Sequence, residues 1–153
     1  MPKVTRSRLI AADPQRVWEL VADPHSLPRW WPRTVRVEDV HFPEPERARW
    51  TAVLGTERGT GVRADYRCTH AVAGERYAWQ QEIAGTPFER VLRSSALEIR
   101  LGAEGDSTRI TLTSDESLRG LSRLGSVMLR GAARRRLDEA LSGVELALVG
   151  EGG

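Results

Sequence analysis

Apolar and polar residues alternate through the middle of the chain, from about Ala48 to Leu112. A period of two places successive side chains on opposite faces of a β-strand. The alternation is interrupted at glycine-containing turns, which are typical of hairpins. Together with a first strand over residues 4–10, the pattern predicts seven strands. Their short connections favour one antiparallel sheet.

The second strand changes its alternation part-way. Val35 and Val37 have one parity, whereas Val40 and Phe42 have the other. A β-bulge inserts one extra residue into a strand and so reverses the alternation beyond it. We therefore predict a bulge near Glu38–Asp39 that keeps both pairs of side chains on the inward face.

Two short helices are predicted between the first and second strands. Asp13 can cap the first helix, and Pro14 fits its first position, where a missing N–H costs nothing. The second helix runs from about residue 24 to Trp30, and Pro32 blocks its extension. Trp30 and Trp31 at its end either plug the core or border a cavity.

A long helix is predicted at the end of the chain. As one straight helix, residues 118–149 would span about 48 Å, roughly twice the length of a seven-residue strand. A flat sheet could not cover its apolar stripe, so the sheet must curl around the helix. Glycines 120, 125 and 131 disfavour a helix interior, so its first half is either kinked over a cavity mouth or a loop that ends near Ser126. The stripe consists of Leu121, Leu124, Met128, Leu137, Ala140, Leu141, Val144 and Leu148.

The inward face of the predicted sheet combines large aromatic residues with polar ones. A dry core would not select these polar groups, because burying an unpaired polar group costs free energy. A cavity with apolar walls and a few convergent polar groups is the usual form of a small-molecule site. The inward residues are Trp50, Tyr66, His70, Tyr77, Trp79, Gln81, Arg93 and Ser95.

Two of these polar residues have an alternative placement. An inward Arg93 would need an ion pair or a wet pocket, whereas a slip of register at the strand end would turn it to solvent. His70 lies near a turn, and is either a general base or a surface residue. The alternation does not decide between these placements.

The length of 153 residues fits one domain, predicted over residues 1–149 with a flexible tail at 150–153. A chain of this size buries roughly 70% of its unfolded surface and can contain a cavity. Its 23 basic residues are spread over the elements, so no nucleic-acid surface is indicated. The run Arg134–Arg136 is typical of a solvated helix face. The chain lacks a signal peptide pattern and an apolar run of membrane-spanning length, so we expect a cytoplasmic protein.

Metal and nucleophilic chemistry have little support in the sequence. The single cysteine, Cys68, lies in a strand pattern and is expected to be a small buried hydrophobic residue. The three histidines, His25, His41 and His70, lack the spacing of metal ligands. We therefore expect no metal and no cofactor.

The order of elements resembles the START/polyketide-cyclase superfamily, also called SRPBCC or birch-pollen-allergen-like. The segments DPQRVWELVADP (13–24), GTPFERVLRSS (85–95) and STRITLT (107–113) look like actinobacterial members described as polyketide cyclase/dehydrase. The resemblance covers about residues 4–148. It implies an α+β helix-grip fold, with a seven-stranded curved antiparallel sheet wrapped around a long C-terminal helix. The superfamily includes lipid carriers, hormone receptors, aromatases and cyclases, and has no single catalytic motif to transfer.

The sequence thus favours a protein that binds a hydrophobic small molecule, lipid-like or polyketide-like, between the sheet and the C-terminal helix. Alternatively, it is a cyclase, aromatase or dehydratase, in which Tyr66, His70 or Arg93 would move protons or stabilise enolate charge. A second alternative is an interaction domain with a filled cavity. The expected ligand-binding residues are Trp30, Trp50, Tyr66, Trp79, Gln81, Arg93, Ser95 and Met128.

Overall fold

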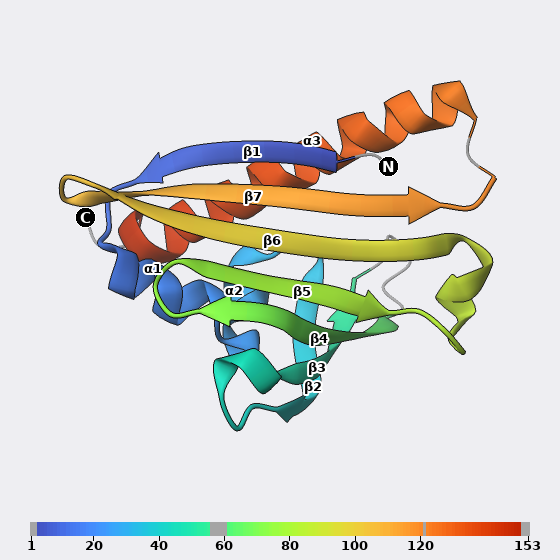
Figure 1. The fold of residues 1–153 in the computed structure, drawn as a ribbon, viewed down its shortest axis with the longest axis horizontal. Coiled ribbons are helices and arrows are strands. Elements are labelled where there is room, and N and C mark those ends of the chain that lie inside the picture. The colour runs from blue at the N-terminus through green and yellow to red at the C-terminus, as the bar shows by residue number, and fades with distance from the viewer. Residues whose placement is uncertain (1–2, 56–60, 121, 151–153) are drawn as a thin grey trace.

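A computed structural model describes residues 3–55, 61–120 and 122–150. Within these residues, seven antiparallel strands form one sheet in the order β1-β7-β6-β5-β4-β3-β2 (Figure 1). From β2 to β7 each strand pairs with the next one in the chain, and β1 is added at the far edge beside β7. The strands are β1 (Lys3–Ile10), β2 (Thr34–His41), β3 (Arg49–Leu54), β4 (Val62–Val72), β5 (Arg76–Glu82), β6 (Leu92–Glu104) and β7 (Ser107–Leu118).

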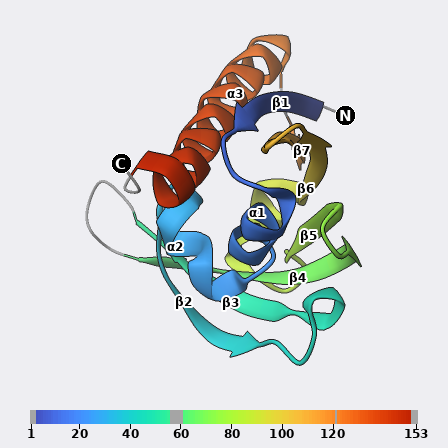
Figure 2. The ribbon, with the colours of Figure 1, turned by 90° about the vertical axis from the view of Figure 1, so that its left-hand side faces the viewer.

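The helices lie on the concave side of this sheet. Figure 2 shows the sheet curving around α1 (Pro14–Val21), α2 (Leu27–Trp30) and the C-terminal part of α3 (Arg123–Glu145). Asp13 caps α1 as expected, since its carboxylate accepts a hydrogen bond from the Arg16 backbone N–H at 3.0 Å. This arrangement confirms the predicted α+β helix-grip fold. Shorter helical turns are η1 (Pro24–Ser26), η2 (Pro45–Arg47), η3 (Pro87–Arg90) and η4 (Leu146–Gly150).

The core lies where the second half of α3 crosses the sheet. Leu137, Leu141 and Val144 of the helix are fully buried together with Ile110 and Leu112 of β7. Burial of side chains of this size contributes roughly 1.5–3 kcal/mol each, so this layer holds the helix on the sheet.

The bulge predicted in β2 is confirmed. The register with β3 shifts between Glu38 and His41, and Asp39 adopts a positive φ of 50°. Beyond the shift, Val40 and Phe42 pack against the core from the same side as Val37. The extra residue therefore returns the apolar side chains to the concave face.

Three residues of the predicted inward rows are exposed: Val35, His70 and Arg93. For His70 and Arg93 this is the solvent-facing one of the two placements that the sequence left open. Each lies at a register shift, in β2, β4 and β6 respectively. A shift places two residues opposite one, which reverses the alternation. In β6 it turns Leu92 inward and leaves Arg93 in solvent, so the inward placement of Arg93 was wrong.

The long helix α3 begins at Arg123, between the two predicted starts. Its apolar residues do not form one stripe, because Leu124 and Met128 are exposed whereas Leu137 is buried. Leu137 lies nine positions after Met128, which is two and a half turns at about 3.6 residues per turn, so the two side chains point in opposite directions. Leu121 and residues 151–153 of the predicted tail lie outside the described residues.

Candidate ligand-binding cavity

A cavity of about 330 Å³ lies on the concave face of the sheet. Its volume is at the lower end of the range of about 300–1,000 Å³ that is typical of small-molecule sites. Val62 lines the cavity and is 40% exposed, so the cavity reaches the surface. The apolar wall consists of Trp31, Pro32, Leu54, Val62, Tyr66, Trp79, Phe88, Ala96 and Leu97, and the polar wall of Arg33, Ser95, Ser114, Glu116 and Arg136.

Trp79 of β5 is the centre of a cluster of aromatic rings behind the apolar wall. Its ring centroid lies 5.4 Å from that of Trp31, 5.7 Å from Trp50 and 6.0 Å from Trp30. Tyr66 of β4 stacks on Trp50, with centroids 5.9 Å apart and an interplanar angle of 13°. Edge-to-face and stacked contacts of this kind fix the orientation of the rings. The cluster therefore presents Trp31, Trp79 and Tyr66 to the cavity in defined positions.

The structure divides the eight predicted ligand-binding residues into three groups. Three line the cavity: Tyr66, Trp79 and Ser95. Three are buried outside its lining: Trp30, Trp50 and Gln81. Arg93 and Met128 are exposed and do not line the cavity, because of the shift in β6 and the phase of α3.

The polar wall is built around an ion pair between β7 and α3. Arg136 donates through Nη2 to Oε1 of Glu116. The Ser114 hydroxyl lies 3.5 Å from the same oxygen. The Glu116 side chain is only 13% exposed, and Nε of Arg136 is buried with no hydrogen-bond partner among the described residues. The cavity therefore meets a fixed pair of charges.

A second hollow, of about 250 Å³, adjoins the cavity beneath α3. The two share Pro32, Arg33, Glu116 and Arg136 in their linings, so the ion pair stands between them. A ligand that passed from one to the other would have to displace the Arg136 side chain.

Sequence reasoning identified Ser95 but missed the other residues of the polar wall. For Glu116 and Ser114 a signal existed, because they continue the alternation of Ile110 and Leu112 on the inward face of β7. For Arg136 there was none. It belongs to a run of three arginines that winds around the helix, so composition does not show which of them faces inward.

Tyr66 is the titratable group of the apolar wall. Burial, and after it the nearby Glu116 carboxylate, raise the pKa of its phenol to about 12, while Arg136 opposes the change. The hydroxyl is therefore neutral at neutral pH and can donate a hydrogen bond to a ligand. It is not a base under these conditions.

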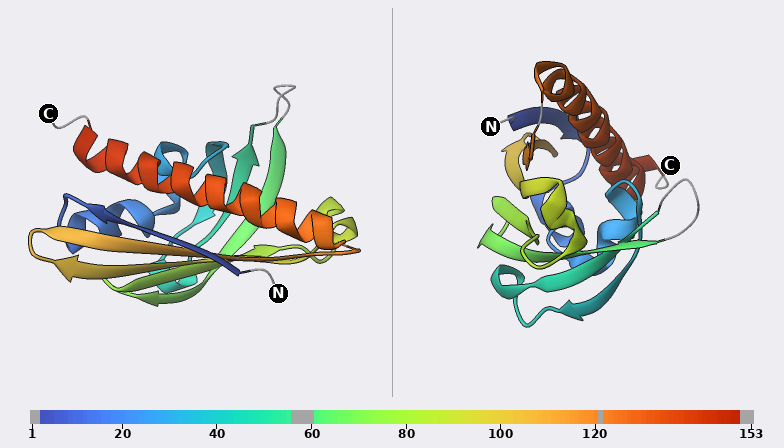
Figure 3. Two further views of the ribbon diagram at one scale, coloured as in Figure 1. Left: turned by 90° about the horizontal axis from the view of Figure 1, so that it is seen from above. Right: turned by 90° about the vertical axis from the view of Figure 1, so that its right-hand side faces the viewer.

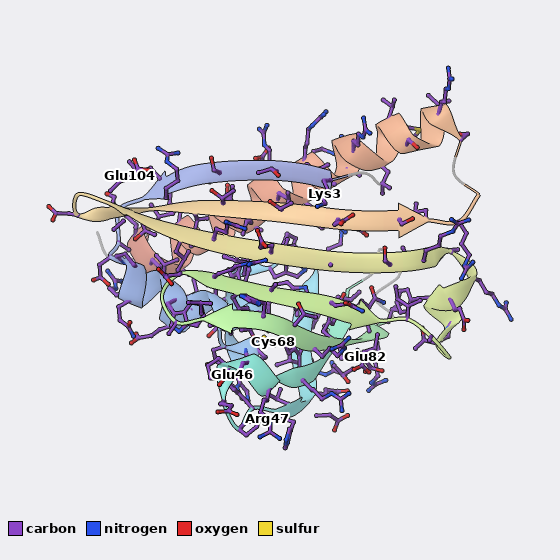
Figure 4. The ribbon with its side chains drawn as sticks, viewed as in Figure 1. Lys3, Glu46, Arg47, Cys68, Glu82 and Glu104 are labelled. Atoms are coloured by element: carbon purple, nitrogen blue, oxygen red, sulfur yellow. The ribbon has the colours of Figure 1, made fainter. Side chains whose placement is uncertain are left out.

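Cys68 lies on β4 (Figure 4), and burial raises the pKa of its thiol. The thiolate is the reactive form of cysteine, and a raised pKa disfavours it. The expectation that Cys68 is a small buried hydrophobic residue is thus confirmed. Within the described residues, no group of histidine, cysteine and carboxylate side chains could hold a metal ion.

The shifted phenol predicts a specific alkaline titration. Tyr66 and Tyr77 are the two tyrosines of the chain, so a Tyr77→Phe variant leaves Tyr66 as the single reporter. Its phenolate absorbance should appear with a midpoint near pH 12, compared with about 10 for an exposed tyrosine. A midpoint near 10 would contradict the burial of this hydroxyl in the folded protein.

The raised pKa of Tyr66 also makes the stability of the protein depend on pH. Below about pH 10 the Tyr66 phenol is protonated in both the folded and the unfolded state, and its full contribution to the free energy of unfolding is present. Between about pH 10 and 12 the unfolded chain loses the proton while the folded protein keeps it, so the free energy of unfolding falls by roughly 3 kcal/mol at most. A Tyr66→Phe variant should lack this part of the alkaline destabilisation in urea titrations.

Comparison with known families decides the identity of the fold. The family described as "Polyketide cyclase / dehydrase and lipid transport" matches residues 1–148. This chain belongs to that family. Comparison with curated proteins gives no match.

Solved structures agree with this polyketide cyclase/dehydrase and lipid transport family. A START superfamily protein from Mycobacterium smegmatis has a TM-score of 0.77 at 12% identity, covering 95% of this chain and 96% of that chain. The di-domain ARO/CYC protein StfQ, from the steffimycin biosynthetic pathway, has a TM-score of 0.78 at 11% identity, covering 97% of this chain and 51% of that chain. At these identities the likeness is one of fold, and this chain spans about half of StfQ.

The family description names both an enzymatic activity and lipid transport. Among the described residues, no helix has both the length and the apolar composition needed to span a membrane. Because the family description names both activities, membership alone does not distinguish a carrier from an enzyme, and the distinction depends on the cavity.

Proposed function

We propose that this family member binds a small hydrophobic ligand carrying at least one polar group in the cavity of about 330 Å³. The observation that carries the proposal is the mixed lining of the concave face. Trp79, Leu97 and Ser114 are successive register partners across β5, β6 and β7, and Ser95 is the partner of Glu116, so the apolar groups adjoin the polar ones. The apolar wall would supply desolvation and shape, and the polar wall would set the orientation of the ligand.

The volume limits the size of the ligand. A cavity at the lower end of the usual range would enclose a small fused-ring system or a medium acyl chain, but not a whole sterol. The neutral Tyr66 hydroxyl and the Arg136 guanidinium, which lines the cavity, are both donors, so they would favour ligands with carbonyl or carboxylate acceptors.

Ligand titration tests this proposal. Medium-chain fatty acids, small aromatic polyketides and sterols would be added while tryptophan emission and melting temperature are followed. Trp31 and Trp79 border the cavity, so a bound ligand should quench or shift their emission. A ligand that binds only the folded protein should raise its stability by about 2.7 kcal/mol at a hundredfold excess over Kd.

Two variants make this titration specific. Ser95→Leu adds bulk inside the cavity and should weaken binding without loss of stability, whereas Ser7→Leu on the exposed side of β1 should leave binding unchanged. An equal effect of both variants, or no response to any compound, would contradict the proposal and favour an interaction domain.

The second candidate function is cyclisation or dehydration of a poly-ketone in the same cavity. The observation in its favour is that Tyr66 lies beside Glu116 and Arg136, a neutral donor next to an ion pair that could stabilise enolate charge. StfQ is an ARO/CYC protein, and the fold that it shares with this chain supports this alternative. The compounds recovered from the titration distinguish the two. A carrier returns its ligand unchanged in both chromatographic retention and mass, whereas cyclisation alone changes the retention at constant mass and dehydration also removes the mass of one water.

A further inference from the structure

The first half of α3 carries an apolar face that no other element covers. Leu124, Val127 and Met128 are 71%, 65% and 66% exposed. Their spacing of three and four residues places them side by side on one face of the helix. Figure 1 and the right-hand view of Figure 3 show these first turns of α3 standing away from the sheet. Exposed apolar side chains that gather on one face mark an interaction site.

This face is flanked by positive charge. Residues 117–137 include six arginines and no carboxylate, although the whole chain has a net charge of only +2. Arg123, Arg130 and Arg134 are exposed. In the part of the chain that the structure describes, the ion pairs of α3 involve Arg136, Asp138 and Glu145, and not these three arginines.

We propose that this face of α3 docks the protein on an anionic lipid surface. A helix with exposed apolar side chains and basic flanks lies in the interface of a bilayer, with the apolar side chains among the acyl chains and the cations at the headgroups. Each arginine held near an anionic leaflet strengthens attachment about fivefold. This inference does not depend on what the cavity binds.

The charges and apolar side chains of this face disfavour two other partners, a second copy of the chain and nucleic acid. A second copy docked face to face through a two-fold axis would bring the three arginines against their own copies, which repel. Nucleic acid would pair with the arginines but would leave Leu124, Val127 and Met128 exposed. An anionic bilayer satisfies both the charges and the apolar side chains.

Sedimentation with vesicles tests this proposal. The intact protein should partition to vesicles of equal parts phosphatidylglycerol and phosphatidylcholine at least about tenfold more strongly than to phosphatidylcholine alone. Partition should fall about tenfold or more when Leu124, Val127 and Met128 are all replaced by serine. It should fall similarly when Arg123, Arg130 and Arg134 are all replaced by glutamine.

A matched control places the same loss of charge elsewhere. Arg47, Arg49 and Arg67 line a hollow on the other side of the molecule, and Figure 4 shows Arg47 far from the start of α3. Their replacement by glutamine should change vesicle binding no more than about twofold. An equal loss in this control would overturn the proposal, because it would show that only net charge matters.

A dye-labelled variant tests membrane contact while most of the exposed apolar and basic side chains of α3 stay in place. Met128→Cys can be modified with a polarity-sensitive dye, because the natural Cys68 is buried. The dye emission should shift to the blue with the anionic vesicles, whereas the same dye at Val35→Cys, on exposed β2, should not respond.

Three results would overturn the proposal. The first is no vesicle binding by the intact protein, or equal binding to both compositions. The second is self-association that the serine variant abolishes, which would assign the face to a second copy of the chain. The third is binding to double-stranded DNA that the glutamine variant loses and the serine variant keeps, without vesicle binding.

Discussion

A Gly143→Ala variant is expected to lose about 3 kcal/mol of stability, which for a chain of this length lowers the melting temperature by roughly 10 °C. An added Cβ would lie 2.5 Å from the backbone oxygen of Trp30, 2.9 Å from its Cα and 3.1 Å from its carbonyl carbon. These are backbone atoms at the end of α2, so relief would require separating α2 from α3. The same movement would shift Trp31 at the cavity wall.

Gly131 in the same helix provides the control. A Cβ at this position would meet only Nη1 of Arg135, at an ordinary contact distance of 3.7 Å. Alanine favours a helix interior by roughly 1 kcal/mol over glycine, so Gly131→Ala should stabilise the protein by up to about that amount. In urea denaturation, Gly143→Ala and Gly131→Ala should therefore change the free energy of unfolding in opposite directions. Similar values would show that the contact with Trp30 does not limit the approach of the helices.

An Arg136→Met variant is expected to lose about 2 kcal/mol of stability. Removing one member of a buried ion pair typically costs about 3–5 kcal/mol, because the remaining charge is left unpaired in a dry site. Glu116 is 13% exposed and would be that charge. Arg136 itself is 37% exposed, so solvent weakens the interaction and we expect less than the full cost.

The double variant Arg136→Met with Glu116→Gln removes both charges and should recover most of this loss. Its comparison with the two single variants in urea denaturation gives the coupling energy of the pair. Arg134→Met is the control, because Arg134 is exposed on the same helix and should change stability by no more than about 0.5 kcal/mol. A double variant as unstable as Arg136→Met would show that packing of the Arg136 side chain, and not its charge, stabilises this wall.

The sequence predicted strands more accurately than their irregularities. In β5 the alternation was sufficient, and Tyr77, Trp79 and Gln81 all lie buried on one face. In β6 the same reasoning failed at Arg93, because a bulge is decided by the pairing of two strands and not by the pattern of one. The bulge in β2 could be predicted since apolar residues on both sides of it recorded the change of parity.

The sequence predicted a cavity with apolar walls and a few polar groups, but identified only some of the residues that line it. Tyr66, Trp79 and Ser95 were identified because regular alternation carried them inward. Met128 was misplaced, although its offset of nine positions from Leu137 already indicates opposite faces. The three glycines that sequence reasoning singled out in the last helix did not include Gly143, where the backbones approach most closely.

By itself, the sequence determined the local structure of this protein, because alternation, caps and turn residues act within a few positions of one another. It thereby determined the seven strands, the two short helices and a long final helix, and with them the fold. Only the tertiary structure decided the ion pair of the polar wall and the uncovered face of α3. Glu116 and Arg136 lie on different elements and meet only once α3 packs on β7. Whether an apolar side chain on α3 is core or surface depends on how far the sheet reaches along that helix, which no local pattern records.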